Sequence, residues 1–139
     1  MRGRVFLYAG LLLLGGLVFA LALTRRRPFE AELQRSGGRP YVVEGARVHN
    51  VFNLQLINKR PGERSFSVEV VGPPFAETVV AAEEVVLDSL GSRRIPVHVF
   101  VPLDRFRAGL RAQLRVVCAD PEGLLERVAS APLLGPSAR

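Results

Sequence analysis

The segment "NVFNLQLINKRPGERSFSVEV", residues 50–70, decides the predicted fold. Apolar and polar residues alternate on both sides of a Pro-Gly pair, and alternation with a period of two is typical of β-strands with one buried face. Pro61 presets φ, and Gly62 can supply the positive φ that a type II turn requires. The segment therefore predicts a β-hairpin with a long strand over Arg47–Asn58 and a return strand after the turn.

The same alternation recurs outward from this segment. It predicts further strands in "RPFEAELQR", "YVV", "ETVVA", "EVVLD", "RRIPVHVFV", "LRAQLRVVCAD" and residues 124–131. Turn signals separate them every 8–12 residues or so, which is typical of β-sandwiches. The fold class is therefore all-β, an immunoglobulin-like β-sandwich of about seven strands. The residues expected between the two sheets are Phe52, Leu54, Phe66, Val68, Val97, Val99, Leu114 and Val116.

Two strand positions carry more specific predictions. Val70 continues the inward row begun by Phe66 and Val68, so it is expected to be buried. Pro96 falls on the opposite face of its strand from the valines. Because proline cannot donate a ladder hydrogen bond, Pro96 predicts an edge position or a bulge.

An apolar block precedes the strands. Residues 5–23, "VFLYAGLLLLGGLVFALAL", contain no charge, and twelve of these nineteen residues are Leu, Val or Phe. A helix of this length would reach roughly 28 Å, close to the thickness of the bilayer hydrocarbon. Insertion of the twelve residues is favourable by roughly 5 kcal/mol in total. The sequence thus predicts two parts, a membrane anchor with basic flanks at residues 1–27 and a β-sandwich domain at residues 28–139.

A cleavable signal peptide is the alternative for the apolar block. Ala20-Leu21-Ala22 has the small-x-small form of a cleavage site,. The run is longer than the usual signal core, and three arginines at 25–27 would follow the cut, so an uncleaved anchor is favoured. Arg2 and Arg4 on one side and the three arginines on the other leave the orientation nearly undecided by charge,.

The net charge of +6 belongs to the flanks of the apolar block. Residues 28–139 carry 14 basic and 13 acidic residues, a balance of +1. A nucleic-acid-binding face would need clustered basic charge on the folded domain. Neither a nucleic-acid partner nor a small-molecule substrate is therefore predicted.

Few residues suggest chemistry, and the sequence predicts no enzyme. Cys118 is the only cysteine and lies in an inward row, as a small core residue would,. His49 and His98 are the only histidines, and each lies opposite an inward row, where a solvated surface histidine is expected. Copper or zinc binding by both histidines with Cys118 is disfavoured because the cysteine points inward. Asn58 closes its strand and is expected to hydrogen-bond the turn backbone. No catalytic, cofactor-binding or metal-binding residue is predicted, and no cofactor.

The order of these segments resembles the C-terminal portion of the FixG/CcoG family, accessory proteins of cbb3-type cytochrome c oxidase. The residues that carry the resemblance are Asn50, Phe52, Leu54, Ile57, Asn58, Lys59 and the pair Gly135-Pro136. Family members also carry several membrane helices and a cysteine-rich polyferredoxin segment, associated with electron transfer and copper reduction. Those cysteines have no counterpart here, so the redox activity cannot be assigned to any residue of this sequence.

The resemblance implies a single-pass protein of the bacterial inner membrane with its C-terminal domain in the periplasm. The expected function is that of a non-enzymatic interaction module, an accessory in assembly of a cbb3-type cytochrome c oxidase or its copper centre. The expected partners are the lipid bilayer and a membrane protein complex, either an iron–sulfur polyferredoxin protein or oxidase subunits. The alternative is a generic envelope β-sandwich, a scaffold or adhesin-like protein unrelated to oxidase assembly.

Overall fold

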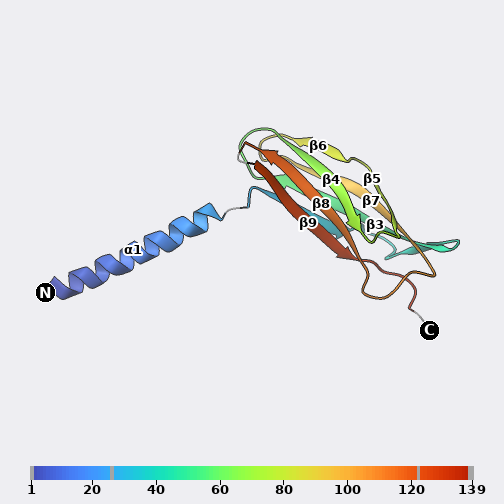
Figure 1. The fold of residues 1–139 in the computed structure, drawn as a ribbon, viewed down its shortest axis with the longest axis horizontal. Coiled ribbons are helices and arrows are strands. Elements are labelled where there is room, and N and C mark those ends of the chain that lie inside the picture. The colour runs from blue at the N-terminus through green and yellow to red at the C-terminus, as the bar shows by residue number, and fades with distance from the viewer. Residues whose placement is uncertain (1, 26, 122, 138–139) are drawn as a thin grey trace.

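The computed structural model describes residues 2–25, 27–121 and 123–137 of the chain. One helix precedes nine strands in these residues, and it projects away from the end of the strand-rich domain (Figure 1). The elements are α1 (Arg2–Thr24), β1 (Phe29–Arg35), β2 (Val42–Glu44), β3 (Arg47–Asn58), β4 (Arg64–Gly72), β5 (Glu77–Val80), β6 (Glu84–Leu87), β7 (Ser92–Pro102), β8 (Arg111–Asp120) and β9 (Gly123–Pro132).

The strands form two antiparallel sheets that face each other. Sheet A has the order β1-β3-β7-β5, with β2 also paired to β3, and sheet B has the order β6-β4-β8-β9. The β-sandwich predicted from the sequence is confirmed, but it has nine strands in the described residues instead of about seven. Every segment in which alternation predicted a strand forms one, and even the three shortest, β2, β5 and β6, pair with longer neighbours. The estimate of about seven strands was therefore too low.

The predicted hairpin at the centre of the sequence is wrong. Both strands form where expected, and Gly62 has a positive φ of 94° in the turn between them. However, β3 pairs with β1, β2 and β7 in sheet A, whereas β4 pairs with β6 and β8 in sheet B. The turn is therefore an arch between the sheets. An arch and a hairpin produce the same alternation, because in both cases each strand turns one face to the core.

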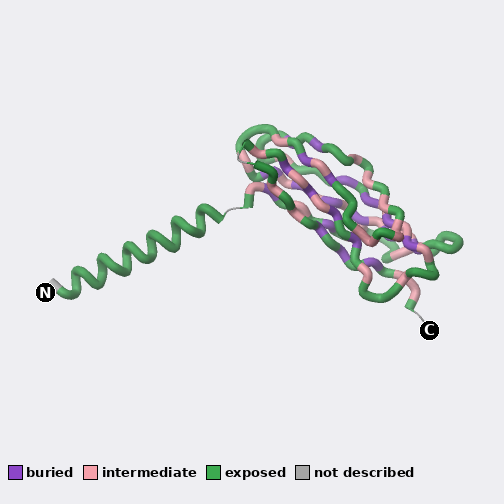
Figure 2. Tube along the Cα trace, in the orientation of Figure 1, coloured by how far each residue is buried: buried purple, intermediate pink, exposed green. Residues whose placement is uncertain are grey.

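The core lies between the two sheets and matches the sequence prediction. All eight residues expected there are buried, and so are Phe29, Ile95 and Val101. Buried and more exposed positions alternate along the long strands in Figure 2. The ring of Phe29 in sheet A meets the ring of Phe66 in sheet B edge to face, with centroids 5.2 Å apart. This contact ties the first strand of one sheet to the middle of the other.

Val70 and Pro96 depart from simple alternation in different ways. Val70 is 47% exposed, which contradicts its expected burial. Val70 is the last residue of β4 in regular register with β8, because the register shifts between Val70 and Gly72. Its exposure thus coincides with the point where the regular ladder ends. Pro96 lies on the outer face of β7, one residue beyond the last β5 pairing, Val80 with Val97. The carbonyl of Pro96 still accepts from the amide of Ala81, so Pro96 lies where the pairing with β5 ends and not on an edge strand.

Helix α1 has a membrane-compatible composition over its whole length. Residues Gly3–Thr24 have a mean hydropathy of 2.4, and no part of this 22-residue segment is buried against the sandwich. Because its apolar side chains surround the helix and find no protein partner, they are suited to lipid. The segment can serve either as a membrane anchor or as a signal sequence.

Candidate functional site

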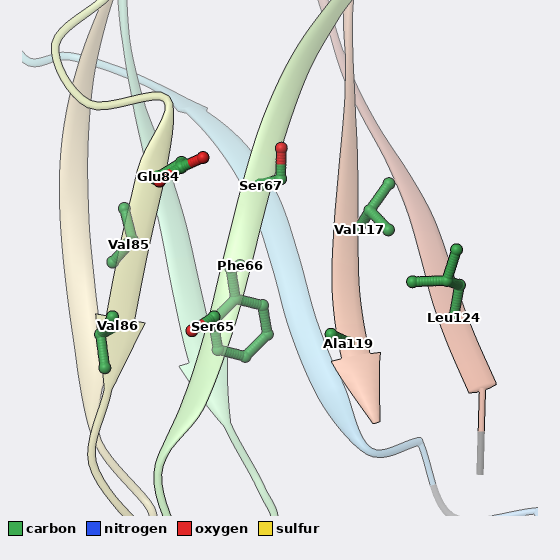
Figure 3. A pocket seen from close by; sticks show the side chains of 9 residues that line it. All are labelled: Ser65, Phe66, Ser67, Glu84, Val85, Val86, Val117, Ala119 and Leu124. Atoms are coloured by element: carbon green, nitrogen blue, oxygen red, sulfur yellow. The ribbon is translucent and has the colours of Figure 1, made fainter. Parts of the chain in front are cut away.

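A shallow recess of about 270 Å³ lies on sheet B and crosses all four of its strands. Figure 3 shows its lining residues, Ser65, Phe66, Ser67, Glu84, Val85, Val86, Val117, Ala119 and Leu124. Phe66 and Val85 form its floor, since both are buried. Val86 and Leu124 stand at its rim and are largely exposed.

The chemistry of the recess favours contact with a surface over covalent catalysis. A serine nucleophile needs a neighbouring base, and histidine is the usual one. Ser65 and Ser67 lie on β4 of sheet B, whereas both histidines lie on strands of sheet A. The recess therefore combines two hydroxyl groups with the exposed apolar side chains of Val86 and Leu124.

The two histidines meet on the outer face of sheet A. In the antiparallel register of β3 and β7, His49 lies opposite Phe100, and His98 lies opposite Val51. This diagonal placement brings Nε2 of His49 within 2.9 Å of Nδ1 of His98. We call these two residues the histidine pair. Only 15% of the His49 side chain is exposed, so the expected picture of isolated, solvated histidines is incomplete.

Neighbouring side chains hold the ring of His49 in one orientation. Phe100 stacks on it, with ring centroids 4.3 Å apart and planes 15° from parallel. Oε1 of Glu44 lies 3.3 Å from Nδ1 of His49. A carboxylate only accepts hydrogen bonds, so this contact assigns the proton of His49 to Nδ1. Nε2 of His49 is then the acceptor, and Nδ1 of His98 donates to it.

The charges around the histidine pair balance locally. Arg47 forms a 2.9 Å ion pair with Glu77, and its guanidinium lies over the ring of Phe100. The positive charge nearest to His49 is therefore partly neutralised. In the part of the chain that the structure describes, no three His, Cys, Asp or Glu side chains are grouped to hold an ion.

Cys118 lies in the core, as the sequence predicts, and not on the outer face that carries the histidine pair. It belongs to the inner row of β8 and is buried in the core. Burial raises the pKa of the Cys118 thiol, and the nearby Asp120 carboxylate raises it further. The thiol is therefore suited to packing and not to acting as a nucleophile or metal ligand.

The sequence did not predict that the two histidines meet. Its alternation correctly placed His49 and His98 on outer faces, but the pairing of β3 with β7 and its register were needed to join them. That register spans 11 residue pairs, and a one-residue slip would turn every β7 side chain to the other face,. The inward rows of both strands would have restricted the register, had the two strands been recognised as neighbours.

A second polar cluster fastens the C-terminal segment to sheet A. The buried Asn50 donates from Nδ2 to the carbonyl of Leu134 at 2.9 Å and accepts from the Leu134 amide at 3.0 Å. Arg35 also donates to Oδ1 of Asn50. Beside it, a Cβ at Gly135 would stand 2.6 Å from the ring of Phe106, so this close approach requires glycine,.

The third polar cluster organises the arch between the sheets. Asn58 donates from Nδ2 to the carbonyl of Gly62 at 2.9 Å, and its Oδ1 accepts from the amide of Arg60. This confirms the predicted bond to the turn backbone. Nδ2 also donates to the carbonyl of Asp88 in the loop before β7. One side chain thus joins the arch to a loop that is remote in sequence.

A family model described as "IG-like fold at C-terminal of FixG, putative oxidoreductase" matches residues 19–132. The chain belongs to this FixG C-terminal domain family. The match begins inside α1 and continues to the end of β9, so it covers the sandwich and part of the apolar helix. The resemblance inferred from the sequence is thereby confirmed.

A solved structure supports the same fold. A FixG-related protein from Vibrio parahaemolyticus matches 77% of this chain and 97% of its own, with 15% identity and a TM-score of 0.56. The PapD-like domain 7 of human CEP192 matches 79% of this chain and 87% of its own, with 14% identity and a TM-score of 0.49. No curated protein matches the chain.

Several residues that carry the FixG resemblance have structural roles. Phe52 and Leu54 are buried in the core, and Asn50, Asn58 and Gly135 hold the two polar clusters described above. These residues therefore serve the packing and the loop connections of the sandwich.

Proposed function

We propose that this FixG C-terminal domain is a membrane-tethered, non-enzymatic interaction module. It acts as an accessory in assembly of a cbb3-type cytochrome c oxidase or its copper centre. Its location is the bacterial inner membrane, with the sandwich in the periplasm. The association of the family with this oxidase supports a role in its assembly. The contribution of the domain itself is to hold the partner proteins together.

The observation that carries the proposal is the short connection between helix and sandwich. Helix α1 ends at Thr24, and β1 begins five positions later at Phe29, while the family match extends across both. With α1 in a bilayer, the sandwich must stay near the membrane surface. Such tethering raises the effective concentration of the domain toward other membrane proteins. This property suits an assembly factor better than a diffusing carrier.

The recess on sheet B supplies a surface for such a partner. Leu124 is 72% exposed at its rim, and removal of such apolar surface from water favours association,. The proposed partners are an iron–sulfur polyferredoxin protein or oxidase subunits, with the lipid bilayer as the second contact. Nucleic acid and small-molecule substrates are not proposed.

Deleting residues 28–139 while keeping the anchor is expected to lower the yield of the assembled oxidase. The measurement is oxidase activity and subunit content in membranes from cells grown at low copper and low oxygen. The matched control keeps the sandwich and replaces α1 by an unrelated membrane helix of equal length, which should preserve assembly. Normal assembly in the deletion strain would replace this proposal with the generic envelope scaffold.

A topology experiment tests the location separately. A reporter fused after Arg139 is expected to be active in a form that works only outside the cytoplasm, since the sandwich is placed in the periplasm. Sequencing the mature N-terminus should give the start of the chain. Activity of a cytoplasm-only reporter would overturn the proposed orientation, and a mature N-terminus at Leu23 would show cleavage after Ala22.

A further inference from the structure

We propose that the histidine pair binds a divalent first-row transition-metal ion through Nε2 of His49 and Nδ1 of His98. The sequence predicted no metal site, and the proposed interaction function does not depend on one. The inference rests on the meeting of the two rings on the outer face of sheet A.

The spacing of the two nitrogens fits one ion. Metal–imidazole bonds are about 2.0–2.1 Å long, so two nitrogens 2.9 Å apart would enclose an angle of about 90° at the metal,. This angle is the one between neighbouring ligands in square-planar and octahedral complexes. It therefore favours Cu²⁺ or Ni²⁺, which adopt tetragonal geometry, over Zn²⁺, which prefers a tetrahedron. Water would complete the coordination from the exposed side of the sheet.

The surroundings prepare His49 as a ligand. Its Nδ1 proton donates to Glu44, so the lone pair at this ring is on Nε2, where it accepts from His98 until an ion replaces that proton. A carboxylate in this position orients a metal-binding histidine and raises its basicity. Stacking on Phe100 fixes the plane of the ring, so little freedom remains to be lost on binding.

His98 changes most when the ion binds. In the metal-free protein its Nδ1 carries the proton that it donates to His49. Coordination requires the other neutral tautomer, with the proton moved to Nε2 by exchange with water and the Nδ1 lone pair turned to the ion. In the hydrogen bond the two nitrogens point at each other, so both rings must turn, each by about 45°, for their lone pairs to meet at one ion,.

The test is titration of the full chain in detergent micelles with Cu²⁺, the strongest binder among these ions. Because the sequence contains only two histidines, imidazole signals belong to the histidine pair alone. We expect one Cu²⁺ per chain whose paramagnetic resonance spectrum shows two imidazole nitrogens. His49→Gln and His98→Gln should each lower the affinity at least tenfold and leave one imidazole nitrogen. Glu44→Gln should weaken binding by about tenfold, the lower end for an orienting partner.

The controls separate this site from other ligands of the chain. The double variant His49→Gln/His98→Gln gives the baseline for the N-terminal amine and the backbone. Cys118→Ala should bind like the wild type, since the thiol lies in the core. Thermal unfolding of each variant verifies that the sandwich is intact. Equal affinity in the wild type and the double variant, or a wild-type spectrum without two imidazole nitrogens, would overturn the proposal.

Discussion

Replacing Phe66 by alanine is expected to reduce the free energy of unfolding by about 3–5 kcal/mol. Phe66 is 1% exposed and lies at the middle of the core, where it meets Phe29 of the opposite sheet edge to face. Truncation would leave a cavity between the sheets and remove an aromatic contact worth about 0.5–1.5 kcal/mol. Since domains are stable by about 5–15 kcal/mol, this loss is a large share of the total.

The single cysteine provides a site-specific readout of this loss. The Cys118 thiol is buried and its pKa is raised, so it should react with alkylating reagents only when the sandwich opens,. Alkylation across a urea gradient then reports on the sandwich without interference from the helix in detergent. The matched control is Val70→Ala on the same strand, because Val70 is exposed and should cost less than about 0.5 kcal/mol,. Similar midpoints for the two variants would contradict the register of β4.

Strand positions could be predicted from the sequence because burial of one face imposes a period of two. The bounds of β3 agree with the predicted range, and the residues expected inward on β7 and β8, Val97, Val99, Leu114 and Val116, are buried. Leu110, which the same alternation places inward, lies just before β8 and is only half-buried. Alternation depends only on which face of a strand is buried. It therefore predicts the position of a strand without showing which strands pair with it.

Strand pairing could not be predicted in the same way. Alternation does not distinguish a hairpin from an arch, and β3–β4 is an arch while β8 and β9 pair directly as a hairpin. The bulge at Val70 is a local irregularity of the β4–β8 ladder, which the sequence of β4 does not record. The histidine pair depends on both pairing and register. The candidate sites were therefore less predictable than the fold, because they lie across strands.

The second large loss of stability is expected at Asn58, whose side chain holds the arch between the two sheets. Asn58 is 1% exposed, and its Nδ2 donates to the carbonyls of Gly62 and Asp88. The change Asn58→Asp keeps the shape of the side chain but places a carboxylate oxygen against two carbonyl oxygens. Both carbonyls lose their donor, and the buried charge keeps only the amide of Arg60 as a donor. We expect a loss of about 3 kcal/mol or more at neutral pH, since each unsatisfied buried group costs about 1–3 kcal/mol.

The pH dependence of this variant separates buried charge from simple loss of packing. Burial should raise the pKa of the introduced carboxyl in the folded state above its unfolded value of about 3.9. Below that unfolded value the group is neutral in both states, and its O–H can donate to one of the two carbonyls. As the pH rises toward the folded pKa, the unfolded state ionises first, so the variant loses stability over this range. The deficit relative to wild type should therefore be smallest in acid and largest at neutral pH.

The matched control for this experiment is Asn53→Asp on the same strand. Asn53 lies on the outer face of β3 and is half-buried, so a carboxylate there remains in contact with water. Its cost should stay below about 1 kcal/mol and change little between acid and neutral pH. Cys118 alkylation in urea measures both variants under identical conditions. Equal deficits for the two variants, or a deficit of Asn58→Asp that does not change with pH, would show that the arch does not rely on the donor atoms of Asn58.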